Sequence, residues 1–156
     1  MKLIYCFVAL ITFVFILPGQ AQNKTEDSTQ TAAALKALVF ACKNVDFADS
    51  KMKDSGMFYK AAPYIIYRGD DKKRNWKDFA DYSNAAEKKG VDNVCYRINS
   101  TINQDSSYKI ESYFTEKESE GVWHVLLIAY KRKGVDKKSA FAFLKVNNRF
   151  GLGDID

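Results

Sequence analysis

The side chains best suited to proton chemistry are a histidine in an apolar segment and an aspartate near the end of the chain. His124 is the only histidine and lies in GVWHVLLIAYKRK, residues 121–133. Asp154 lies in the final segment, RFGLGDID. Burial shifts the pKa of such groups toward the range in which a general base works. Either residue could therefore serve an isomerase or dehydratase if it faced an apolar cavity.

The register of the last two strands predicts which face carries Asp154. Asn147 and Asn148 suit a two-residue hairpin turn, because asparagine tolerates positive φ. Counting outward from this turn places Asp154 on one face of the sheet with four apolar side chains. These are Phe141, Phe143, Phe150 and Leu152.

Other interpretations of both residues stay open. Asp154 is close to the chain end, where exposure to solvent is common. His124 begins a strand and could be a solvated or hydrogen-bonded residue at the sheet end. The sequence contains no nucleophile elbow, glycine-rich phosphate loop or cluster of metal ligands. It therefore predicts no cofactor and no metal, and it favours a binding protein over an enzyme.

The hydrophobic spacing predicts helices in the first half of the domain. In residues 31–43 the apolar positions recur at helical intervals, and Asn84 followed by Glu87 resembles a capping pair for a helix that continues to Ile102. Shorter helices are predicted over residues 47–52 and 76–82. The predicted buried faces consist of Leu35, Leu38, Val39 and Cys42 in the first helix, and of Val91, Val94, Cys95, Ile98 and Ile102 in the later one.

Strand patterns replace helical ones after Asp105. Alternation predicts strands over residues 108–115, 122–132, 139–146 and 149–155, with a short earlier strand at 64–67. Helices followed by an antiparallel meander indicate an α+β domain in which N-terminal helices pack on a curved sheet.

The pattern of elements in residues 31–156 resembles the nuclear transport factor 2-like (cystatin-like, cone-shaped) domains, in a secreted form of bacterial envelope type. The resemblance is carried by the opening helix running into KNVDF, the amphipathic helix at 85–102, the long strand VWHVLLIAYKRK and the terminal hairpin. It implies a cavity between sheet and helices, and such domains include enzymes as well as binding modules.

Five residues are the predicted ligand-binding side chains of that cavity, for a small apolar molecule or a protein segment. They are Tyr64, Tyr67, Phe141, Phe143 and Leu152. The opposite face of the long strand carries Trp123, Val125 and Leu127, which could form a homodimer interface or pack within the chain.

The N-terminus has the layout of a secretory signal peptide. Lys2 precedes an apolar run of 15 residues, and Gly19 and Ala21 provide small residues for cleavage after Ala21. A membrane anchor is the alternative, but about 20 residues are needed to cross a bilayer. We therefore predict a signal peptide at 1–21, a flexible leader at 22–30, one domain at 31–156, and no membrane span in the mature chain, which would be periplasmic or extracellular.

Export bears on the two cysteines of the domain. In an oxidising compartment Cys42 and Cys95 could form a disulfide, although two buried thiols would satisfy the same pattern. The net charge of +5 is spread over several mixed runs, which does not favour nucleic-acid binding. The sequence thus predicts an exported binding module, with a cavity enzyme or a protein–protein interaction domain as alternatives.

Overall fold

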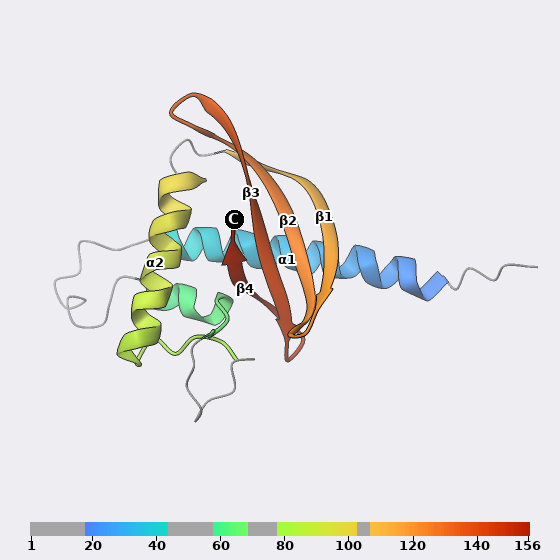
Figure 1. Ribbon diagram of the computed structural model, residues 1–156, viewed down its shortest axis with the longest axis horizontal. Helices are drawn as coiled ribbons and strands as arrows, with labels where there is room; N and C mark the ends of the chain where they lie inside the picture. Colours follow the sequence, from blue (N-terminus) through green and yellow to red (C-terminus); the bar gives the residue numbers. More distant parts are fainter. Residues whose placement is uncertain (1–17, 44–57, 69–77, 103–106) are drawn as a thin grey trace, which may run out of the picture.

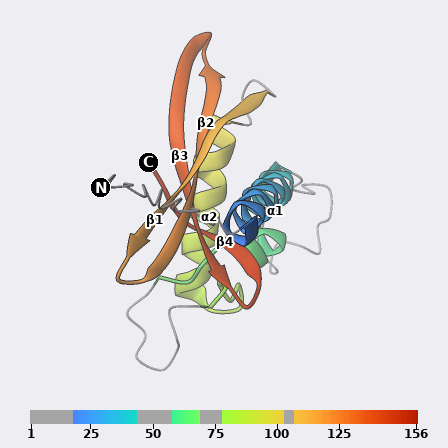
Figure 2. The ribbon, with the colours of Figure 1, turned by 90° about the vertical axis from the view of Figure 1, so that its right-hand side faces the viewer.

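The computed structural model describes residues 18–43, 58–68, 78–102 and 107–156, which form an α+β fold with two long helices on one side of an antiparallel sheet (Figures 1 and 2). The elements are α1 (Pro18–Lys43), the 3₁₀ helix η2 (Tyr59–Tyr64), α2 (Ala85–Thr101), β1 (Tyr108–Glu118), β2 (Gly121–Arg132), β3 (Val135–Val146) and β4 (Arg149–Ile155). The predicted helix at 47–52 lies outside the described residues.

The four strands pair in sequence order, β1-β2-β3-β4, as the alternation predicted. Asn147 and Asn148 form the last turn with φ of 48° and 61°, which confirms the predicted hairpin. The other two connections are shorter than predicted. In particular, β2 and β3 meet at a two-residue turn of Lys133 and Gly134, with φ of 53° and 77°. Positive φ at both turn positions matches the right-handed twist of the strands.

Helix α1 begins before the predicted helix and includes the segment expected to be a flexible leader, residues 22–30. That expectation is wrong, because polar groups in this segment have partners. Asp27 forms an ion pair with Lys145 of β3 at 2.7 Å, and the buried Thr31 hydroxyl donates to the Asp27 carbonyl at 2.6 Å. No helix in the described ranges combines the length and apolarity needed to span a bilayer.

The core forms where α1 and α2 pack on the inner face of the sheet. In Figure 1, α1 crosses behind the strands. The predicted faces of both helices are buried, with only Val94 partly accessible. Asn84 caps α2 as predicted and accepts from Ala86 N at 2.9 Å. Glu87 departs from a reciprocal capping box, because its carboxylate accepts from Asp81 N at 2.6 Å.

A short irregular segment covers part of the outer face of the sheet. Ile65 bridges to Leu152 and Ile66 bridges to Phe79, so the predicted strand at 64–67 is reduced to two isolated bridges. The helix predicted over 76–82 is wrong for residues 78–82, because Phe79 is extended and pairs with Ile66. Residues 76 and 77 lie outside the described ranges.

This cover bears on the two interpretations of the outer stripe. Trp123 and Val125 are buried in a cluster with Ile66, Leu144 and Val146. Leu127 is partly accessible. Packing within the chain therefore covers Trp123 and Val125, as one of the two interpretations expected, and a homodimer through the sheet stays a prediction.

A β-bulge corrects the predicted position of Asp154. Lys145 pairs with Phe150 and Phe143 with Leu152, as predicted, but the register then shifts and Phe141 pairs with Ile155. Gly153 is the extra residue, so Asp154 opposes Ala142 on the outer face and is exposed. A Cβ at Gly153 would lie 2.6 Å from two ring atoms of Trp123, so the bulge residue is held beneath the indole.

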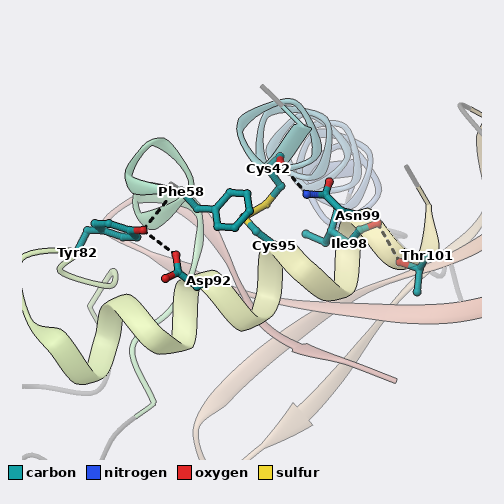
Figure 3. Close-up of a disulfide and its surroundings, with 8 residues drawn as sticks. All are labelled: Cys42, Phe58, Tyr82, Asp92, Cys95, Ile98, Asn99 and Thr101. Atoms are coloured by element: carbon teal, nitrogen blue, oxygen red, sulfur yellow. Dashed lines mark hydrogen bonds between the residues drawn. A yellow bond between two sulfur atoms is a disulfide. The ribbon is translucent and has the colours of Figure 1, made fainter. Parts of the chain in front are cut away.

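A disulfide joins Cys42 of α1 to Cys95 of α2, with Cα atoms 4.9 Å apart (Figure 3). The Phe58 ring lies beside it, and Asn99 donates to the Cys42 carbonyl at 2.9 Å. Tyr82 accepts from Phe58 N at 3.1 Å and donates to Asp92 at 2.6 Å. Burial and the Asp92 carboxylate raise the pKa of Tyr82 to about 12. The disulfide region is thus fixed by both covalent and hydrogen bonds.

Substituting the glycines tests the close contact above β4. Gly151→Ala places a Cβ 2.5 Å from Cδ1 of Ile66 and 2.8 Å from Cε1 of Phe79, so unfolding in urea should show a loss of about 1–3 kcal/mol. Gly90→Ala is the matched control, because it meets nothing within 4 Å. Removing a helical glycine should stabilise the fold by about 0.5–1 kcal/mol. Equal stability changes in both variants would contradict the packing described.

Removing the disulfide tests the link between the helices. The bond closes a separation of 53 residues, and the chain-entropy model gives about 4 kcal/mol for a loop of that size. We expect the Cys42→Ala/Cys95→Ala variant to lose an amount of this order in urea unfolding. Its stability should be unchanged by dithiothreitol, whereas the native protein should lose stability in the reductant.

Candidate functional site

His124 lies on the inner face of β2 and is 5% exposed, so of the two alternatives considered from the sequence the structure shows a hydrogen-bonded residue and excludes a solvated one. Its Nδ1 is 2.7 Å from the Tyr113 hydroxyl of β1. The Phe150 ring contacts the imidazole edge-on at 4.8 Å between centroids. His124 is therefore enclosed by neighbouring strands and has a specific polar partner.

The electrostatic setting of His124 favours the neutral imidazole. Burial lowers the pKa of His124, and Lys145 acts in the same direction, while Asp27 partly opposes the shift. Burial and the charge of Asp27 raise the pKa of Tyr113. Tyr113 therefore keeps its proton and His124 is neutral, and the histidine tautomer sets which of the two groups donates the hydrogen bond. This arrangement satisfies a buried polar group and also leaves the imidazole unprotonated, as a general base requires.

His124 also borders a hollow of about 410 Å³. Asp27 and Lys145 line the same hollow and are paired with each other. Asp154 does not reach it, because the bulge places that residue on the opposite face of the sheet. The Asp154 carboxylate instead accepts from Ile155 N at 2.8 Å. The two residues singled out for proton chemistry therefore do not form a pair.

A mainly apolar hollow lies between α2, the segment at residues 65–68 and β4, with a volume of about 440 Å³. We call it the α2–β4 cleft. Its apolar lining is Ile65, Ile66, Ala80, Ala86, Val91, Val94, Leu152 and Ile155, and its other lining residues are Tyr67, Arg68, Glu87, Gly90, Arg97, Gly153 and Asp154.

The charged side chains of the α2–β4 cleft have partners within the protein. Arg97 donates to the Ile155 carbonyl. Arg68 lies 3.3 Å from both carboxylate oxygens of Glu120 and stacks over the Trp123 ring at 5.2 Å. Glu87 is buried and accepts from Asp81 N. The cleft therefore presents apolar surface, and the charged side chains named above are already paired with other groups of the protein.

The five predicted ligand-binding residues separate into two groups. Tyr67 and Leu152 line the α2–β4 cleft. Phe141 and Phe143 are fully buried in the core, and Tyr64 packs against that core. The inner face of β3 was expected to line a cavity, but the two helices fill the space above it.

Sequence reasoning missed the side that α2 contributes to the cleft. Glu87, Gly90, Val94 and Arg97 follow one another at helical spacing and line the hollow together. The sequence feature that could have predicted this side of the cleft is Gly90, which lies between the apolar positions of the helix. A glycine there leaves open space where a larger side chain would project.

Metal binding finds no support in the part of the chain that is described, where no group of three histidine, cysteine or acidic residues could hold an ion.

Comparison with known proteins found no match among protein-family models, curated proteins or solved structures. The site must therefore be interpreted from its own geometry.

The single histidine allows a direct test of its burial. The unfolded chain takes up a proton at His124 near pH 6.5, whereas the lowered pKa delays protonation in the folded state. Lowering the pH through about 6.5 should therefore reduce the free energy of unfolding, and this stability is fully present above that pH. Urea unfolding between about pH 7.5 and 5.5 measures the slope.

The control is His124→Gln, which keeps a polar acceptor for Tyr113 and does not titrate. We expect its stability to vary less over the same interval, where few other groups change charge. The same pH slope in both proteins would show that His124 titrates normally in the folded state.

Proposed function

We propose that this protein is an exported binding module that holds a small apolar ligand in the α2–β4 cleft. The observation that carries the proposal is the cleft of about 440 Å³ with its mainly aliphatic lining. Its volume falls within the range of about 300–1,000 Å³ that is usual for small-molecule sites. Apolar ligands gain from leaving water in such a site without requiring a charged partner.

The lining supports an apolar ligand over an anionic one. Arg68 and Arg97 already satisfy Glu120 and a backbone carbonyl. A carboxylate or phosphate ligand would have to displace these contacts before it could bind. A hydrocarbon body against Val91, Val94 and Leu152 would leave them intact.

Export is the second part of the proposal. The apolar run at residues 3–17 and the small residues before the proposed cleavage point support it. The Cys42–Cys95 disulfide is compatible with an oxidising compartment. Cleavage after Ala21 would leave Asp27, whose ion pair with Lys145 links α1 to the sheet.

A nuclear transport factor 2-like fold is the family proposal that suits this architecture. An N-terminal helix packs on one face of a four-stranded antiparallel sheet, and a second helix borders the cleft. The resemblance implies a ligand cavity between helices and sheet, and the cleft lies at one edge of that space, between α2 and the edge strand β4.

A cavity enzyme using His124 is the second candidate. The buried, neutral imidazole bordering the hollow of about 410 Å³ favours it. This hollow has different lining residues from the α2–β4 cleft. Loss of His124 should therefore abolish an activity of that hollow and leave ligand retention in the cleft unchanged.

Filling the cleft tests the binding proposal. A Cβ at Gly90 meets no atom within 4 Å and Gly90 lines the cleft, so we expect the ring of Gly90→Phe to occupy the cleft and exclude a ligand. Native mass spectrometry of the protein from an envelope fraction, under non-reducing conditions, should show a retained small molecule in the unmodified protein. Gly90→Ala should retain it, and Gly90→Phe should lose at least about 90% of the bound fraction, as expected when a site becomes sterically blocked.

Asn93→Phe controls for an added aromatic ring, because Asn93 is exposed on α2 and does not line the cleft. Retention of the same molecule by Gly90→Phe would place the ligand elsewhere. A retained mass of peptide size would identify a protein segment as the ligand, and a bare unmodified protein would contradict the proposal.

A further inference from the structure

The β2–β3 hairpin extends beyond the body of the domain. Figures 1 and 2 both show its tip projecting past α2. Residues 131–138, which we call the hairpin arm, are all exposed. The last buried position on β2 is Tyr130, so the arm begins where the core ends.

The hairpin arm carries most of the protein's excess positive charge. Its sequence, KRKGVDKK, has five basic residues and one acidic residue, which gives a net charge of +4. The whole chain has a formal net charge of +5, so all the other residues together contribute +1. The net positive charge is therefore concentrated on one projecting element, which corrects the spread inferred from the sequence.

The base of the arm has a hollow that could receive an anionic group. This hollow has a volume of about 520 Å³. Lys109, Ala129 and Lys138 lie side by side across β1, β2 and β3, and Lys131 also lines the hollow. Lys138 is paired with Glu111 at 2.6 Å. Lys109, Lys131 and Lys137 provide further positive charge around Ala129, and Asp136 is the second acidic residue of the lining.

The tip of the arm combines this charge with an apolar side chain. Val135 is 54% exposed directly after the turn of Lys133 and Gly134. Basic side chains around an exposed apolar residue suit the headgroup region of a bilayer, where both kinds of group gain stabilisation. Single-stranded nucleic acids are bound without sequence preference partly by base stacking on aromatic residues, and the arm contains none.

We propose that the hairpin arm docks the protein on an anionic lipid surface, with its lysines on phosphate headgroups and Val135 at the interface. The arm shares no lining residue with the α2–β4 cleft. The proposal is therefore independent of whether the cleft binds a ligand.

Vesicle co-sedimentation of the full chain tests the proposal. We compare vesicles of phosphatidylcholine with vesicles that also contain phosphatidylglycerol. Binding that depends on phosphatidylglycerol should weaken as salt rises from about 0.05 to 0.5 M, because ions screen exposed charges. The apolar run at residues 3–17 is present in every variant and should contribute to binding on both vesicle types.

Charge removal locates the contact. Lys131→Gln/Lys133→Gln/Lys137→Gln should reduce the phosphatidylglycerol-dependent partition coefficient about 100-fold, since each lysine near such a surface contributes about fivefold. Lys36→Gln/Lys89→Gln/Lys117→Gln removes the same charge from exposed positions on α1, α2 and β1 and should change binding far less. Circular dichroism and thermal unfolding of both triple variants would establish that they remain folded.

Three results would overturn the proposal. The first is equal binding to both vesicle types, and the second is an equal loss in the two triple variants. The third is binding that depends only on phosphate groups and not on a lipid surface. In that case free inorganic phosphate or an oligonucleotide would compete fully with the vesicles, and Val135→Ser would bind vesicles as well as the unmodified protein. On the proposal, Val135→Ser weakens vesicle binding about threefold because less apolar surface leaves water.

Discussion

The bond between Cys42 and Cys95 fixes the position of α2, and the α2–β4 cleft depends on that position. Cys95 is buried against the end of α1, while Val91, Val94 and Arg97 face the cleft from the same helix. A rotation or shift of α2 would change the width of the cleft and also break the hydrogen bond from Asn99 to the Cys42 carbonyl. The covalent link therefore holds the hollow open while the other side of α2 completes the core.

The sequence allowed prediction of elements whose determinants are local. Helical spacing identified the buried faces of α1 and α2, Asn84 marked the start of α2, and Asn147 with Asn148 set the last turn. Each of these features depends only on residues that are close together in the sequence. The α+β class follows from their order along the sequence.

The errors arose where distant parts of the chain decide the local structure. Gly153 forms a bulge beneath Trp123, a contact across three strands, and this bulge moves Asp154 to the outer face. Phe79 is extended because it pairs with Ile66 and packs close to Gly151. No pattern near Phe79 or Asp154 reveals these contacts. For this reason the predicted cavity included Phe141 and Phe143 on the inner face of β3. The observed cleft lies instead at the edge of the sheet, along the side of β4 that faces away from β3.

Polar groups also order a part of the protein that composition alone suggested was flexible. Asp27 links α1 to Lys145, and its charge acts on both His124 and Tyr113. Asp27 thus links α1 to the sheet through an ion pair, where an apolar stripe would normally be expected. A sequence scan for hydrophobic periodicity does not detect such an anchor.

The hairpin arm differs from the rest of the sheet in what its charge does for stability. A two-stranded ribbon gains from opposite charges across the strands, as at Lys131 and Asp136. Lys137 and Lys138 instead lie opposite Tyr130 and Ala129, and Arg132 lies opposite Val135. Equal numbers of positive and negative side chains would be enough to keep the arm soluble. An excess of one sign adds repulsion within the ribbon, and an anionic surface would relieve that repulsion on contact.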